Sequence, residues 1–411
     1  MMNFNGELPN IFLFNPTCDY AIANGKASWQ PNRLLQKMET DLTSLQLFFA
    51  RNTDFIIVNR LPSAKFTEKL KTIGIHPPGF ILKENIIRST IAEISKNCLF
   101  PWGWSPAAHK LLSPLKDSCA ESFKNSPVFN WATEHKNLYS KKFAVQVLKQ
   151  ITSTIPSSDL IPQNRIAEIC TSKTEVETLI SRWGKIMVKA PWSSSGRGLQ
   201  PVTKIPVHPK VWEKILGVIN EQGYVVVEPF LNKAFDFSFQ FKLSNEKIEF
   251  LGISNFTTDN KGQYVGNSLN GLPVNVSLKI REFQQNVIKT LLDPLISILE
   301  STELATLYEG NFGVDTLIYA DENDDLKINP CLEINIRQNM GLLSLHLEKL
   351  ITSGKKGIYR MFYSPGKTFK EFAREMEILH PLVIYNQKIE SGFFALTEAF
   401  DDSLFGSYIL V

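Results

Sequence analysis

Two acidic segments in the C-terminal half most constrain how this chain folds. Asp315 lies in the first segment, and Glu333 and Asn335 lie in the second, Glu-Ile-Asn-Ile-Arg. The intervening acidic turn predicts a β-hairpin with strands at 311–319 and 326–335. Residues two apart on a strand point to the same face, so Glu333 and Asn335 share a face and Asp315 lies on the neighbouring strand.

Three oxygen side chains on one sheet face suit Mg²⁺, or Mn²⁺ in its place. Carboxylates this close repel one another unless a cation lies between them. The alternative is a solvated strand edge with alternating polarity. Arg337 continues the polar face, where its guanidinium would hold a phosphate or a developing oxyanion.

A lysine and a glycine-rich segment lie upstream of the acidic motif. Lys189 ends an apolar strand predicted at 185–189, where its ammonium can neutralise a phosphate. Backbone N–H groups of a glycine-rich loop approach phosphate oxygens closely. The loop residues that we predict to contact phosphate are Ser194, Ser195, Gly196, Arg197 and Gly198. The alternative interpretation is an exposed Ser/Gly turn after an ordinary strand.

A hinge is predicted between these two motifs. The apolar strand 224–228 ends at Glu228 and continues into Pro-Phe-Leu, which includes Phe230 and Leu231. Backbone groups at a hinge of this kind commonly hold adenine. Asp236, slightly downstream, would reach ribose hydroxyl groups. Ordinary solvation of a strand end explains Glu228 or Asp236 equally well when each is taken singly.

The composition, 43% apolar and 21% charged over 411 residues, is ordinary for a globular protein with two or three domains. The net charge of +3 is too small to indicate a nucleic-acid partner. No segment is long and apolar enough for a membrane span, and the N-terminus lacks a signal-peptide pattern. The five cysteines form no C-x-x-C pair, which favours reduced thiols and a cytoplasmic location.

Alternating strands and helices predict an α/β class, with an open-sheet domain over residues 1–135. The predicted elements there are strands at 11–14 and 55–58, helices at 33–50 and 63–73, and a tryptophan-rich loop at 100–106. A second domain is predicted over 136–411, with 185–255 as its smaller lobe. The loop 15–19 follows the first strand, at the end of an open sheet where ligands bind. It would help to hold a substrate, or simply form a turn stabilised by Asn and Asp.

The order of these motifs resembles the ATP-grasp superfamily of carboxylate–amine ligases over about residues 137–345. The resemblance implies an open-sheet α/β domain followed by a two-lobed α+β module that clamps nucleotide in its smaller lobe. It implies that Lys141 or the adjacent Lys142 is the first phosphate lysine and Lys189 the second. The remaining implied roles are adenine binding by Glu228, Phe230 and Leu231, ribose binding by Asp236, metal binding by Asp315, Glu333 and Asn335, and catalysis by Arg337 and Lys189.

The chain departs from the superfamily pattern in four places. The ribose acid is aspartate where glutamate is more usual, and the glycine-rich loop contains a run of three serines. The spacing from Asp315 to Glu333 is long, and Ile336 stands where many relatives have proline. None of these departures removes a catalytic oxygen or charge. The resemblance therefore implies an active enzyme, but it does not single out one ligase.

The implied reaction is ATP- and Mg²⁺-dependent joining of a carboxylate to an amine or similar nucleophile. It would pass through an acylphosphate and release ADP and phosphate. The expected partners are small-molecule or peptide carboxylates and amines, with neither nucleic acid nor membrane. Two alternatives stay open: a phosphotransferase that uses the same nucleotide site, and a non-catalytic nucleotide-binding protein.

Overall fold

The computed structural model shows a mixed α/β chain that divides into two compact units, each described here by itself. The described residues are 7–86, 90–193, 196, 198–259 and 262–411. The first unit consists of Met1–Trp131, Val265–Gly271 and Arg337–Val411, and the second of Ala132–Tyr264 and Leu272–Ile336. Both units contain helices and sheets, which confirms the predicted α/β class.

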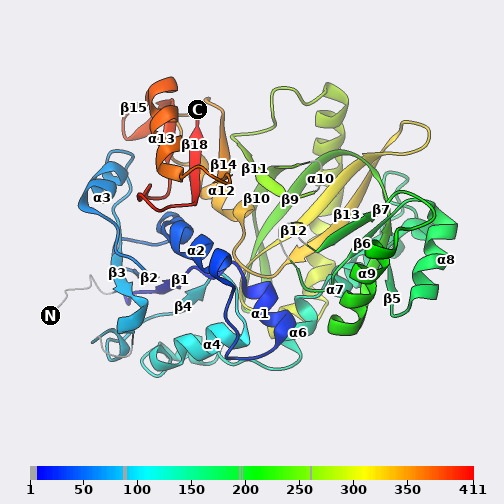
Figure 1. Cartoon of the computed structure of the whole chain (residues 1–411), viewed down its shortest axis with the longest axis horizontal. Coiled ribbons are helices and arrows are strands. Elements are labelled where there is room, and N and C mark those ends of the chain that lie inside the picture. The colour runs from blue at the N-terminus through cyan, green and yellow to red at the C-terminus, as the bar shows by residue number, and fades with distance from the viewer. Residues whose placement is uncertain (1–6, 87–89, 194–195, 197, 260–261) are drawn as a thin grey trace. The chain divides into compact units, whose positions relative to one another are not determined.

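A four-stranded sheet in the order β3-β2-β1-β4 organises the N-terminal part of the first unit (Figure 1). All its neighbouring strands are parallel. Its strands are β1 (Ile11–Leu13), β2 (Phe55–Val58), β3 (Gly79–Leu82) and β4 (Leu99–Pro101). The open sheet is as predicted, but β3 and β4 were not, and β4 overlaps the expected loop. Their backbone pairing with β2 and β1 defines them as strands.

Two helices of this part begin directly after a side chain that caps them. Asn32 accepts a hydrogen bond from the backbone N–H of Leu35, which starts α2 (Arg33–Leu42), and Ser63 caps α3 (Ala64–Lys71) in the same way. The predicted helix 33–50 continues past α2 as a 3₁₀ turn, Thr43–Phe48. The remaining helices are α1 (Cys18–Asn24), α4 (Pro106–Leu112) and α5 (Glu121–Lys124).

The C-terminal segment packs within the first unit, whereas the sequence pattern placed it in the second domain. Its strands β14, β18 and β17 pair in that order and are antiparallel, and β14 also pairs with β11 (Tyr264–Leu269) from an earlier stretch of the chain. The strands of the C-terminal segment are β14 (Gly357–Tyr363), β15 (Val383–Tyr385), β16 (Lys388–Ser391), β17 (Phe393–Ala395) and β18 (Phe405–Leu410), and its helices are α12 (Met340–Glu348) and α13 (Phe369–Leu379). A long-range anchor explains the difference: the buried carboxylate of Asp41 on α2 accepts hydrogen bonds from the backbone N–H groups of Leu404 and Phe405.

Replacing Asp41 with alanine is expected to lower the free energy of unfolding by about 2–4 kcal/mol, because two backbone donors lose their acceptor. Chemical denaturation followed by circular dichroism measures this loss. Asp402→Ala is the control, since Asp402 makes only surface ion pairs with Lys37 and Arg60, each worth less than about 1 kcal/mol. Equal losses in the two variants would show that the hydrogen bonds to Asp41 do not hold the C-terminal segment in place.

His346 on α12 makes the first unit sensitive to acid. Its ring lies 4.9 Å from that of Phe49, and burial, with Lys349 nearby, lowers its pKa to about 4. The unfolded chain takes up the proton near pH 6.5 and the folded chain only near pH 4. Stability is therefore expected to fall by about 1–3 kcal/mol as the pH drops between these values. His346→Gln should flatten this part of the stability profile, and an unchanged profile would contradict the assignment.

The smaller sheet of the second unit is antiparallel, in the order β5-β8-β6-β7. Its strands are β5 (Glu168–Cys170), β6 (Ile186–Lys189), β7 (Leu199–Val202) and β8 (Val225–Pro229). One face packs against α8 (Lys173–Trp183), which starts at the predicted Ser172–Glu175 capping box, and α9 (Pro209–Gln222). The predicted lobe 185–255 divides between two sheets, because its strands after residue 231 pair within a second, larger sheet.

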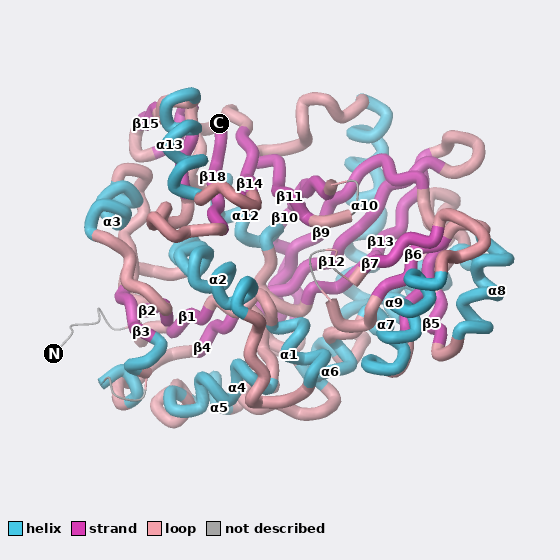
Figure 2. Tube along the Cα trace, in the orientation of Figure 1, coloured by secondary structure: helices cyan, strands magenta, loops and turns pink. Residues whose placement is uncertain are grey.

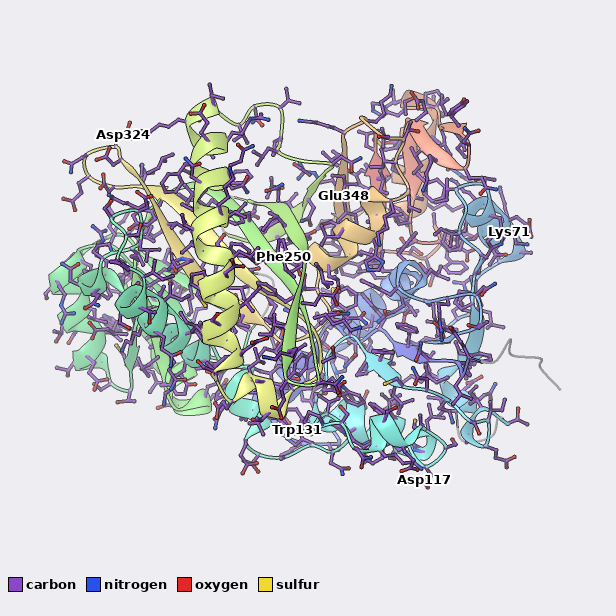
Figure 3. The ribbon with its side chains drawn as sticks, turned by 180° about the vertical axis from the view of Figure 1, so that it is seen from behind. Lys71, Asp117, Trp131, Phe250, Asp324 and Glu348 are labelled. Atoms are coloured by element: carbon purple, nitrogen blue, oxygen red, sulfur yellow. The ribbon has the colours of Figure 1, made fainter. Side chains whose placement is uncertain are left out.

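Those strands belong to a larger antiparallel sheet. Figure 2 shows β9 (Asn232–Ser244), β12 (Gly310–Ala320) and β13 (Leu326–Asn335) running side by side, and β10 (Lys247–Thr258) follows β9. The predicted hairpin is thus confirmed as β12–β13. The long helix α10 (Leu278–Glu300) lies across this sheet, near the labelled Phe250 of β10 in Figure 3. The other helices of the unit are α6 (His135–Leu138), α7 (Lys141–Thr154) and α11 (Leu304–Leu307).

Two global features concern membranes and disulfides. Among the described residues, no helix combines the length and hydrophobicity needed to cross a bilayer. No disulfide joins any of the five cysteines, and four of them are buried.

Candidate functional site

Lys141 and Glu333 of the second unit form an ion pair in which the lysine is buried. Lys141 is the first residue of α7, and its ammonium donates hydrogen bonds to Oε1 of Glu333 at 2.8 Å and to the carbonyl of Ser193 at 2.9 Å. Its side chain is only 5% exposed, whereas the adjacent Lys142 is exposed. The structure therefore brings Lys141, and not Lys142, to the acidic strand.

Lys189 and Glu228 form a second such pair, with 2.7 Å between Nζ and Oε1. Alternation along β6 and β8 places both residues on the face opposite the helices, because Val188 and Val227 on the other face belong to the core below α8 and α9. Both side chains are largely buried. The strand position predicted for Lys189 is confirmed, and its partner is the carboxylate of the predicted hinge.

The two pairs belong to one charged cluster. Burial raises the pKa of Glu228, the nearby Lys189 lowers it, and the negative charge of Glu333 raises it further. Lys141 also acts on the pKa of Glu228, although its own ion pair is with Glu333. Residues from α7, β6, β8 and β13 therefore bring two lysines and two carboxylates within electrostatic range of one another.

The loop after β6 is shaped by two of the predicted glycines. Gly196 has a φ of +72°, and a Cβ there would lie 2.5 Å from the carbonyl oxygen of Gly262. A Cβ on Gly198 would lie 2.1 Å from Oγ of Ser193, and that hydroxyl accepts a hydrogen bond from Lys141 at 3.2 Å. Glycine is thus required where the loop passes Lys141. The predicted Ser194, Ser195 and Arg197 lie outside the described residues.

Gly198→Ala is expected to displace Ser193 and weaken Mg·ATP binding by about 10-fold, equivalent to one lost hydrogen bond of about 1.4 kcal/mol. Isothermal titration calorimetry measures the change. Gly217→Ala is the matched control, because a Cβ on Gly217 in α9 meets no atom within 4 Å. Equal affinity of the two variants would show that the loop does not depend on Gly198.

The acidic residues lie in register on the larger sheet. Asp315 is directly opposite Glu333 on the paired strand, and Asn335 donates a hydrogen bond to Oδ2 of Asp315 at 2.9 Å. The other face carries the buried Val314 and Ile334, as predicted from the alternation. Among the described residues, no three His, Cys, Asp or Glu side chains cluster as a complete metal cage.

This donor set fits magnesium bound together with phosphate. Mg²⁺ usually takes one or two carboxylates and completes its shell with water and phosphate oxygens. Asp315 and Glu333 supply two carboxylates on facing strands, and Asn335 adds an amide oxygen. A softer metal would prefer Cys or His ligands, and none of the three is of that type.

The predicted adenine and ribose residues follow β8. Phe230 is 43% exposed, and its backbone N–H bonds to the carbonyl of Lys185 at 3.0 Å; Leu231 is partly exposed. Asp236 on β9 is buried and accepts hydrogen bonds from Lys233 at 2.8 Å and from Thr258 at 3.3 Å. Burial raises the pKa of Asp236, while Lys233 and, more weakly, Lys189 lower it. Asp236 thus lies within electrostatic range of the charged cluster.

Arg337 belongs to the first unit. Its Nε donates a hydrogen bond to Oδ2 of Asp19 at 3.1 Å, and each side chain is 11% exposed. Gly103 is required beside them, because a Cβ there would lie 2.3 Å from Sγ of Cys18. The predicted loop 15–19 therefore contacts the arginine at the end of the acidic motif.

Three polar residues complete these contacts: Ser193 holds Lys141, Lys233 neutralises Asp236, and Asp19 holds Arg337. Of the three, only Lys233 was not predicted to belong to the site. Ser193 opens the glycine-rich loop, and Asp19 belongs to the predicted loop 15–19. Asp19 lies 318 positions from Arg337, and no local pattern indicates that pairing.

Comparisons with known proteins identify the fold. Neither a protein-family model nor a curated protein sequence matches the chain. A beta-gamma-ATP complex of biotin carboxylase from Campylobacter jejuni is similar with a TM-score of 0.52 and 14% identity, covering 98% of this chain and 87% of that one. An ADP complex of N5-carboxyaminoimidazole ribonucleotide synthetase has a TM-score of 0.50 and 10% identity. The match covers 100% of this chain and 94% of that one. Identities this low show that the chain shares the fold of these two proteins.

Proposed function

We propose that this chain is an ATP- and Mg²⁺-dependent ligase that joins a carboxylate to an amine or similar nucleophile. A substrate carboxylate attacks the γ-phosphate of ATP and forms an acylphosphate and ADP. The nucleophile then displaces phosphate and forms the new bond, which is C–N for an amine. The solved structures of similar fold are complexes with beta-gamma-ATP and with ADP, which supports an ATP-dependent reaction.

The observation that carries the proposal is the pair of buried lysines, each held by a carboxylate. Burying a charge is unfavourable unless it is paired, and Lys141 also opposes the dipole at the start of its own helix. Charged residues that stay where burial and a helix dipole disfavour them mark functional sites. The start of α7, with Lys141 and Lys189 nearby, suits the negative charge of a triphosphate.

Each residue has a role in the proposal. Lys141, Lys189 and the backbone of the Gly196–Gly198 loop position the triphosphate, while the segment after β8 and Asp236 hold the nucleoside. Asp315, Glu333 and Asn335 would hold Mg²⁺, which neutralises charge on the phosphates when bound. Arg337 is proposed to stabilise the oxyanion that develops on the acyl group.

A thermal-shift titration tests the proposal first. Binding to the folded state raises Tm by mass action, so ATP with Mg²⁺ should raise Tm and EDTA should reduce the rise. No shift at about 1 mM ATP, far above the Kd expected for a nucleotide enzyme, would reject an ATP-dependent function.

If ATP binds, products distinguish the reaction classes. Incubation with ATP and panels of carboxylates and amines should release ADP and free phosphate together with a coupled product. A stable phosphorylated acceptor without free phosphate would instead support a phosphotransferase. Binding without any turnover would support a non-catalytic nucleotide-binding protein.

A further inference from the structure

A small pocket lies at the carboxyl ends of the parallel strands in the first unit. Residues after β1, β2 and β3 contribute to its wall, together with α2, α4 and the loop before α2. It has about 90 Å³ of free space, which is room for several water molecules. Ligands of open α/β sheets bind at this end of the strands, so the pocket suits a ligand of only a few heavy atoms.

One side of the pocket carries a carboxylate. Glu39 on α2 lines it, and Oε1 of Glu39 accepts a hydrogen bond from the Thr17 hydroxyl at 2.5 Å. Burial raises the pKa of Glu39, and the hydroxyl of Thr17 and the charge of Lys83 oppose that rise. No cation within the described parts of the chain forms an ion pair with Glu39. A cationic ligand group beside it would therefore favour its charged form.

The pocket also carries an ammonium group. Lys83, directly after β3, lines it and acts electrostatically on Glu39. The two side chains nevertheless do not form an ion pair within 4.0 Å, and Lys83 has no other ion-pair partner among the residues that the structure describes. Two opposite charges thus line one pocket without neutralising each other directly.

The rest of the wall mixes apolar and uncharged polar side chains. Ala21, Trp29, Ala108 and Leu111 contribute apolar surface, and Asn15, Asn59 and Ser105 contribute polar groups. The apolar part of the wall favours a hydrocarbon group, while the two charges favour a ligand that carries both an ammonium and a carboxylate group. A ligand with only one of these groups would leave either Glu39 or Lys83 without a partner.

We propose that this pocket binds a free α-amino acid with a small side chain, with Glu39 receiving its ammonium group and Lys83 its carboxylate. Glycine and alanine, with five and six heavy atoms, match the scale of the free space. That this amino acid is a substrate rests on the ligase function proposed above, whereas its binding does not. The inference therefore names the substrate class and can be tested without turnover.

The first test compares L-alanine with two fragments of it. Glycine, L-alanine, ethylamine and propionate are titrated separately into the full chain, and Tm is recorded. We expect a saturable rise with glycine and L-alanine, and at least about 10-fold weaker binding of ethylamine and propionate, because each loses one charged contact worth about 1.4 kcal/mol or more. The proposal is overturned if either fragment binds as tightly as L-alanine, or if neither amino acid saturates by about 10 mM, a range that would detect even millimolar affinity.

The second test uses charge-neutral variants. Glu39→Gln and Lys83→Met should each weaken L-alanine binding by at least about 10-fold, whereas Glu68→Gln and Lys65→Met on the exposed side of α3 should not. If Glu39→Gln fails to fold, Lys83→Met is the deciding variant, because Lys83 is partly exposed and tolerates replacement. Unchanged affinity in Lys83→Met would overturn the assignment.

Mg·ATP titrated into the same wild-type samples separates the two proposals. A shift with Mg·ATP but none with an amino acid rejects the amino-acid pocket and leaves the ligase proposal in place. A shift with L-alanine but none with Mg·ATP rejects the ligase and leaves the pocket as a binding site.

Discussion

Lys141→Met is expected to weaken Mg·ATP binding by about 10- to 100-fold. The variant removes the ammonium that would contact phosphate, and hydrogen bonds to charged groups are worth about 1.5–3 kcal/mol. It also leaves Glu333 without its 2.8 Å partner, so the negative charges of Glu333 and Glu228 repel more strongly. Calorimetric titration with Mg·ATP measures the affinity, and Tm without ligand reports the effect on folding.

Lys142→Met is the matched control for this prediction. The two lysines are adjacent in α7 and chemically identical, but Lys142 is exposed while Lys141 is buried against Ser193 and Glu333. We expect Lys142→Met to bind Mg·ATP within about 2-fold of the wild type, as is usual for surface changes below ~0.5 kcal/mol. Reversed outcomes for the two variants would show that the wrong lysine has been assigned to phosphate.

Glu333→Gln is expected to lower ATP turnover by at least about 100-fold. A metal ion at phosphate contributes several kcal/mol to the transition state, and each ~1.4 kcal/mol corresponds to 10-fold in rate. The amide keeps an oxygen that can accept from Lys141, so the fold should persist. ADP release with the identified substrates measures turnover. The rise of Tm with ATP should become insensitive to EDTA.

The control for this change lies on the same hairpin. Glu322, in the turn between β12 and β13, has a side chain that is 90% exposed and pairs only with Arg165 at the surface. Glu322→Gln should keep the turnover and the Mg²⁺ dependence of the wild type. If Glu333→Gln behaves like Glu322→Gln, the metal assignment is incorrect.

Local patterns in the sequence were sufficient for the elements that carry the candidate site. Alternating polarity predicted the β12–β13 hairpin, with Ile334 buried on one face and Glu333 on the other. The predicted helix start at residue 33 agrees with the start of α2, which Asn32 caps. These signals depend on residues within about four positions of each other, so they can be read without knowing the tertiary structure.

Which charges meet is decided by the tertiary structure. Lys141 and Glu333 are 192 positions apart, and Arg337 and Asp19 are 318 apart. Asp41 likewise draws the C-terminal segment into the first unit across more than 360 positions. No periodicity encodes such pairings, because they arise only when separate sheets and helices pack together.

The sequence by itself therefore determined the α/β class, the acidic hairpin and the residue types available for ATP chemistry. Only the tertiary structure chose Lys141 over Lys142, paired Lys189 with Glu228 and placed Glu39 and Lys83 around one pocket. The physical reason is the distance along the chain over which each effect acts. Backbone propensity and side-chain alternation act over a few residues, whereas burial and charge pairing depend on which distant segments share a face.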